Sequence, residues 1–358
     1  ALLATSDGRK VFFCPRFGVR LVRKWPKPPQ DARPVWIGPQ AESRGDEHAL
    51  QACADGRPSD GFADLYSKFD NWSFIPRLPR PPFHMVSRVR SVSTRPNAPE
   101  EGAVAVAEFD VPEKAFYFDD YGTGAMPFSL LLEAMLQPCG WLACHGGFAL
   151  EGGKSFRNLD GEGTVHRELR PGEATLQVTT TMTRFSRAGP TTLVFFDVSG
   201  VLTDGTPVMD LTTSFGFFDR GSLARQVGLK VGEHENDWMA LPGADVPVED
   251  PADLLPGGDM RMLDRVDHFE PSGGSAGLGL IRGRQAITPS AWYFKAHFFR
   301  DPVQPRLKVI GRGERKAAFP RRKPSDIVGQ HPDLLQGIGS GSVGDRRRGP
   351  LNGRFPVG

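Results

Sequence analysis

Two aromatic runs in this chain are nearly alike, and their similarity restricts the fold more than any other feature. The first extends from Phe116 to Pro127 and begins Phe-Tyr-Phe-Asp-Asp-Tyr. The second extends from Trp292 to Pro305 and begins Trp-Tyr-Phe-Lys-Ala-His, so that only the second contains a histidine, His297. A motif that recurs in this way predicts that one structural unit occurs more than once in the chain.

Two further pairs of segments extend the repeat. His84–Val89 matches Arg261–Val266, and Ser6–Val11 matches Thr203–Val208. The chain therefore opens with the end of one repeat, continues through a whole one and stops partway through another. In chain order we predict the end of an upstream repeat (1–23), a linker and docking segment (24–75), a complete repeat without the histidine (76–222), a linker (223–250), the first part of a histidine-bearing repeat (251–305) and a basic, disordered tail (306–358).

Hydrophobic periods within the complete repeat predict its architecture. Residues 103–109 alternate between apolar and other side chains, as in a half-buried strand. Residues 128–143 are apolar on nearly all sides, which indicates a buried helix. Strand-like runs follow at 161–169, 174–184, 191–202 and 208–218. A long buried helix followed by a meander predicts an α+β hotdog fold, in which an antiparallel sheet wraps around a central helix; the last repeat is truncated.

Composition places the chain among globular proteins with an ordinary core, since 39% of its residues are hydrophobic and 10% are aromatic. Its cysteines are too few and too scattered for a disulfide framework, and they lack histidines at zinc-ligand spacing: Cys14, Cys53, Cys139 and Cys144. We expect reduced thiols, a cytoplasmic location and no signal peptide. The most apolar stretch, 128–142, contains Glu133 and Gln137 and is too short and too polar to span a bilayer.

The net charge of +2 is unevenly distributed. Basic residues concentrate after Arg306, whereas residues 1–305 are mildly acidic. Nucleic-acid binding inferred from the basic pI would therefore depend on the tail alone. We expect neither nucleic acid nor a membrane as a partner.

The two motifs also resemble those of a known family. Trp292–Pro305, with Asp264–Val266 and Gly273-Gly274 upstream, resembles the bacterial 3-hydroxydecanoyl-ACP dehydratase/isomerase family. The helix sequence Leu-Leu-Glu-Ala-Met-Leu-Gln-Pro-Cys-Gly-Trp at Leu131–Trp141 is similar to one in the tandem hotdog dehydratase region of polyunsaturated-fatty-acid and polyketide synthases. The similarity covers roughly residues 1–23 and 48–305.

This resemblance implies a function and a site. It implies dehydration of 3-hydroxyacyl thioesters to trans-2-enoyl products in fatty acid or polyketide biosynthesis, on an acyl carrier protein with a phosphopantetheine-linked acyl chain. His297 then becomes the catalytic base and Glu133 the acid, with Phe128 and Gln137 as substrate-binding residues. The chemistry agrees, because dehydration needs a base for the C2 proton and an acid for the departing hydroxyl, and imidazole accepts protons near neutral pH. No metal or other cofactor is implied; the partners are other synthase domains and a second hotdog unit, in a pseudo-dimer or homodimer.

Several alternatives remain open at this point. His297 and Glu133 either share one site or belong to two incomplete sites, since the family tends to place a histidine repeat before its partner. A hotdog thioesterase, which uses a carboxylate to activate water, is a rival enzyme. A non-catalytic hotdog that binds acyl chains or docks neighbouring domains is a rival of another class, favoured for the complete repeat because its aromatic run has no histidine at Asp119–Tyr121.

Overall fold

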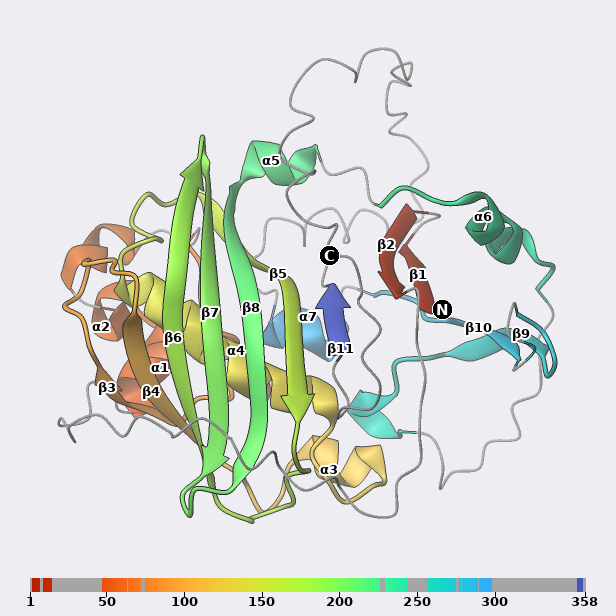
Figure 1. Cartoon of the computed structure of the whole chain (residues 1–358), viewed down its shortest axis with the longest axis horizontal. Helices are drawn as coiled ribbons and strands as arrows, with labels where there is room; N and C mark the ends of the chain where they lie inside the picture. The colour runs from red at the N-terminus through yellow and green to blue at the C-terminus, as the bar shows by residue number, and fades with distance from the viewer. Residues whose placement is uncertain are drawn as a thin grey trace, which may run out of the picture.

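A seven-stranded antiparallel sheet lies against one long helix, and the two together form the largest part of the structure (Figure 1). The computed structural model describes residues 2–6, 9–14, 47–62, 64–71, 75–225, 229–243, 256–274, 277, 279–288, 290–297 and 353–356. The strand order is β11-β5-β8-β7-β6-β4-β3. These strands are β3 (Arg88–Val92), β4 (Ala103–Asp110), β5 (Lys154–Val165), β6 (Thr175–Ala188), β7 (Thr191–Leu202), β8 (Pro207–Asp219) and β11 (Gly353–Pro356).

The central helix, α4 (Phe128–His145), crosses one face of this sheet (Figure 1). It begins after Pro127, whose carbonyl accepts the first intrahelical hydrogen bonds, and it ends before Gly147, whose φ of 87° favours glycine. It also packs closely, because a Cβ atom added to Gly200 on β7 would lie 2.6 Å from the Sδ atom of Met135. None of the helices in the described residues combines the length and the apolar character that crossing a bilayer requires.

Each of the helix and strand runs predicted within 76–222 has a counterpart in the structure. The run at 191–202 coincides with β7, and 103–109 lies within β4. The largest difference is β5, which begins at Lys154 rather than at residue 161. A register shift between Asn158 and Asp160 interrupts its alternation, so the first part of the strand carries no period of two.

A group of short helices covers one end of the core. These are α1 (Glu47–Asp55), α2 (Pro58–Phe62) and the 3-10 helix η1 (Asp64–Phe69). They contribute Leu50, Phe62, Tyr66 and Phe69 to the same buried cluster as α4. This is the described part of the predicted linker and docking segment; residues 24–46 of that segment and residues 306–352 of the predicted tail lie outside the described residues.

Smaller elements lie beside the main sheet (Figure 1). They are the hairpin β1 (Leu2–Ser6) and β2 (Arg9–Cys14), helices α3 (Phe116–Tyr121), α5 (Arg220–Ala224), α6 (Glu233–Ala240) and α7 (Trp292–Ala296), the 3-10 helix η2 (Gly258–Met260), and the hairpin β9 (Arg265–Glu270) and β10 (Leu280–Arg284). Helix α6 contacts both hairpins. The Nζ atom of Lys10 on β2 lies 2.6 Å from Oε1 of Glu235, and Arg282 on β10 donates to the carbonyl of Leu241, 2.8 Å away, at the end of α6.

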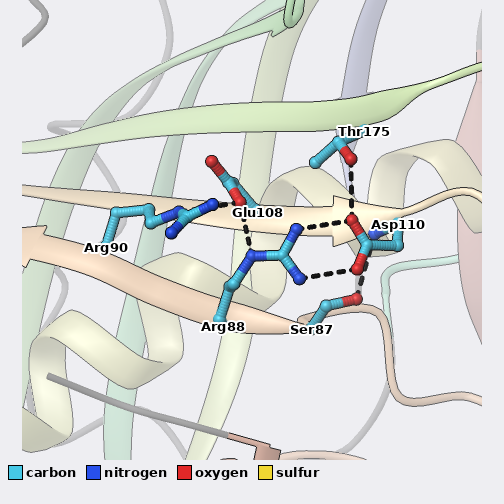
Figure 2. Close-up of polar contacts among 6 residues, drawn as sticks. All are labelled: Ser87, Arg88, Arg90, Glu108, Asp110 and Thr175. Atoms are coloured by element: carbon cyan, nitrogen blue, oxygen red, sulfur yellow. Dashed lines mark hydrogen bonds and ion pairs between the residues drawn. The ribbon is translucent and has the colours of Figure 1, made fainter. Parts of the chain in front are cut away.

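A charged network ties β3 to its neighbour β4 (Figure 2). The guanidinium of Arg88 donates to Glu108 and to both carboxylate oxygens of Asp110, each at 2.6 Å, and Arg90 lies 2.9 Å from Glu108. Thr175 on β6 donates to Asp110 at 2.7 Å. The hydrogen bonds from Arg88 lower the pKa of Asp110, with Thr175 adding to the effect.

Candidate active site

Helix α7 brings His297 onto α4, next to Glu133. The Nε2 atom of His297 lies 3.9 Å from Oε2 of Glu133. This separation is longer than a hydrogen bond and short enough for both groups to act on one small substrate. The side chains are 33% and 23% exposed, so both are in contact with solvent. The sequence analysis predicts that the two residues belong to different repeats, and within this one chain the structure brings them together.

The segment before β3 holds the histidine in place. The backbone N–H of Arg80 donates to the carbonyl of Ala296 at 2.7 Å, and the N–H of His297 donates to the carbonyl of Tyr293 at 2.8 Å. The ring of Phe83 meets the imidazole edge-on, with 5.4 Å between ring centroids. Arg80 and Phe83 therefore fix both the main chain and the ring of His297.

Gln137, one turn after Glu133 on α4, connects the acid to that same segment. Its Nε2 donates to the carbonyl of Phe83 at 2.8 Å and to Oε2 of Glu133 at 3.3 Å, and its Oε1 accepts the N–H of Met85 at 2.7 Å. The side chain is buried. The amide of Gln137 thus contacts Glu133 directly and His297 indirectly, through Phe83, so Gln137 can position both side chains. Substrate binding by Gln137 stays a prediction.

The two aromatic motifs meet at the site. The ring of Trp292, which begins the second run, contacts Phe116, which begins the first, with 5.2 Å between centroids. Trp292 also contacts Phe83 at 5.9 Å and donates its indole N–H to the carbonyl of Asp259. Helices α3 and α7 are therefore neighbours, and Tyr121 at the end of α3 holds the position that His297 holds after α7.

A pocket lies next to this arrangement. Its volume is about 430 Å³, and its lining includes Met85, Phe109, Phe116 and Tyr117. Met85 is bonded to Gln137, and Phe116 contacts Trp292, so the pocket shares its wall with the site. Burial raises the pKa of Tyr117 to about 12, and the lining also includes the charged residues Asp110 and Lys114.

Of the predicted site residues, Phe128 lies at the first position of α4 and is 39% exposed. Phe83 and Arg80 were not among the predicted site residues. The only feature that marks this segment in the sequence is its prolines before β3, and they do not indicate which side chain contacts His297. Among the described residues, no three His, Cys, Asp or Glu side chains gather in a way that could hold a metal ion.

Comparison with known proteins identifies the class. A family model described as a FabA-like domain matches residues 78–212 and 255–310, which is more than half of the chain. The chain therefore belongs to the FabA-like family of hotdog dehydratases. The matched segments contain Glu133 and His297, one in each.

Individual relatives add context. The chain is 28% identical over 284 residues to one of the subunits of a polyunsaturated fatty acid synthase from Thraustochytrium sp., in a match that covers 70% of this chain and 19% of that protein. The chain thus spans about a fifth of the length of this relative. Among solved structures, a hypothetical thioesterase with coenzyme A from Streptococcus pneumoniae TIGR4 is 12% identical, with a TM-score of 0.26, over 36% of this chain and 85% of that one. The PaaI protein of E. coli is 15% identical, with a TM-score of 0.25, over 34% and 80%.

Proposed function

We propose that this chain is a 3-hydroxyacyl-[acyl-carrier-protein] dehydratase, a lyase that forms trans-2-enoyl thioesters in fatty acid or polyketide biosynthesis. The observation that carries the proposal is the approach of His297 to Glu133, at 3.9 Å, within a member of the FabA-like family. A base and an acid side by side are what dehydration of a 3-hydroxyacyl thioester needs.

The proton transfers balance between these two residues. His297, as the neutral imidazole, takes the C2 proton through Nε2, and the electron pair forms the C2–C3 double bond as the C3–O bond breaks. Glu133, as the carboxylic acid, gives its proton to the departing hydroxyl, which leaves as water. A proton then passes from His297 to Glu133 and restores both groups. The elimination of water involves no net oxidation or reduction, and His297 and Glu133 together account for both proton transfers, so the proposed step uses no cofactor.

The substrate needs an apolar surface beside this pair. Phe128, exposed at the start of α4, is suited to contact the acyl chain, and the pocket bordered by Met85 and Phe116 has a largely apolar wall. Gln137 contributes by holding Glu133 and the 83–85 segment, as its three hydrogen bonds indicate.

The partners follow from the substrate and from the relative. The acyl chain would arrive on the phosphopantetheine arm of an acyl carrier protein, and other synthase domains would supply the substrate and consume the product. A second hotdog unit would pair with this one, as a pseudo-dimer or a homodimer. We place the reaction in the cytoplasm, with neither nucleic acid nor a membrane as a partner.

An assay of enoyl formation from a 3-hydroxyacyl thioester of N-acetylcysteamine or acyl carrier protein tests the proposal. We expect His297→Ala and Glu133→Gln each to lower kcat by about 100-fold or more, which is the usual contribution of a general acid or base. His234→Ala and Glu100→Gln change exposed residues elsewhere and should keep full activity. Equal activity in all five proteins would overturn the assigned roles. Acyl-thioester binding without turnover in the unmodified chain would favour the non-catalytic hotdog instead.

A further inference from the structure

Each of the two aromatic runs is held by an equivalent backbone hydrogen bond. The N–H of Arg80 donates to the carbonyl of Ala296, the fifth residue of the second run, at 2.7 Å. The N–H of Gly257 donates to the carbonyl of Asp120, the fifth residue of the first run, at 2.6 Å. Arg80 and Gly257 each lie four residues before one of the two matched segments. The first run is thus held by the segment before β9, and the second by the segment before β3.

The first run has a side-chain contact in addition. Asp120 stands where the second run has Ala296, and its Oδ2 atom accepts the N–H of Asp259 at 2.9 Å. The turn η2 fits closely around this carboxylate, because Gly258 has a φ of 43° and a Cβ atom added there would overlap the carboxylate of Asp120. The side chain of Asp120 therefore fixes η2 to the end of α3.

The same turn holds the beginning of α7. The carbonyl of Asp259 accepts the indole N–H of Trp292, the first residue of α7, at 2.8 Å. His297 follows the last residue of this short helix, and its N–H donates to the carbonyl of Tyr293 at 2.8 Å. Two hydrogen bonds and one short helix therefore connect the carboxylate of Asp120 to the imidazole of His297.

We propose that Asp120 is a positioning residue, which holds His297 opposite Glu133. It acts through the hydrogen bonds of Asp259 and Trp292. The inference rests on the proposed function, since the position of His297 matters to the reaction only if His297 is the base. A displacement of about 1 Å at a catalytic group lowers a rate by up to about 100-fold, so a link of this kind controls kcat. The run that has no histidine thus aligns the histidine of the other run.

Removing the acceptor tests this inference in the full chain. We expect Asp120→Ala to lower kcat for enoyl formation by about tenfold or more and to change KM by less than about twofold, because Asp120 does not contact the substrate. Asp120→Asn should keep kcat within about threefold of that of the unmodified chain, since a carboxamide oxygen also accepts an N–H. Asp119→Ala changes the exposed carboxylate next to it in the sequence and should keep full activity.

A double-mutant cycle tests the route of this effect. Trp292→Phe keeps an aromatic ring and removes the indole N–H, so it should also lower kcat. If both residues act on His297 along one route, the double variant should lose no more kcat than the more impaired single variant. Losses that multiply in the double variant, equal losses with Asp120→Ala and Asp120→Asn, or full kcat in Asp120→Ala would each overturn the inference.

A signal that needs no turnover separates this inference from the proposed function. In protein labelled with ¹³C at Cε1 of histidine, the NMR signal of His297 is assigned with His297→Ala. It should shift in Asp120→Ala and in Trp292→Phe, and it should stay in place in Asp119→Ala. Absence of enoyl product from the unmodified chain would refute the proposed function, whereas an unshifted signal in Asp120→Ala would refute the positioning of His297 in an active or an inactive chain. If Asp120→Ala does not fold, the signal in Trp292→Phe decides in the same way.

Discussion

Replacing Gln137 with Met is the sharpest single perturbation of the site. The change keeps the length of a buried side chain and removes its hydrogen bonds to the N–H of Met85 and the carbonyl of Phe83. Leaving a buried polar group unpaired costs about 1–3 kcal/mol, so two such groups predict a loss of about 2–6 kcal/mol of unfolding free energy. Chemical denaturation monitored by circular dichroism measures this loss.

The same substitution should separate positioning from binding. Without the amide, Glu133 and the segment that contacts His297 lose their common tie, so kcat should fall by about 10-fold or more while KM changes little. Gln51→Met is the matched control, because Gln51 is an exposed helical glutamine and its replacement should alter neither quantity. A destabilisation below about 0.5 kcal/mol, or a rise in KM at constant kcat, would refute the positioning role.

Two further predictions concern pH and thiol chemistry. Because Arg88 lowers the pKa of Asp110, the ionised Asp110 stabilises the fold above the unfolded-state pKa of about 3.9, and this stabilisation is lost as the pH falls through the lower folded-state value. Asp110→Asn should therefore lower the unfolding free energy at pH ~7 and lower it less towards pH ~2.5, which urea midpoints would measure. A loss of stability that is the same at both pH values would contradict this prediction. Burial also raises the pKa of three thiols, so a Cys14→Ser variant should react with a thiol reagent only after denaturation, and labelling of the folded protein at pH ~8 would argue against their burial. These thiols are Cys53, Cys139 and Cys144.

The long-period features of the fold were predictable from sequence. An 18-residue helix buried on most sides, and strands that alternate over a dozen residues, leave a hydrophobic pattern that local irregularities do not erase. The start of β5 could not be predicted, because its bulge breaks the alternation. The helices α1 and α2 also went unassigned, since each is too short to show several turns of a period.

The site was predictable only in part. The histidine motif and the apolar helix identified His297 and Glu133 as candidates, whereas their approach to 3.9 Å depends on how α7 packs against α4, which no local pattern encodes. The role of Phe83 depends on the same packing. Gln137 was expected to bind substrate, and its bonds to backbone groups of a distant segment become visible only in three dimensions.

The contact between α3 and α7 bears on how many proton-accepting side chains the two aromatic motifs provide together. Two copies of one motif contact each other through Phe116 and Trp292, yet one ends in Tyr121 and the other in His297. A phenol does not accept a proton near neutral pH as an imidazole does. If the dehydratase assignment is correct, each pair of motifs therefore contains one proton-abstracting centre rather than two. The α3 motif then has a structural role, through the contact of Phe116 with Trp292, and no catalytic role. Substitutions at Tyr121 should therefore be tolerated where those at His297 are not.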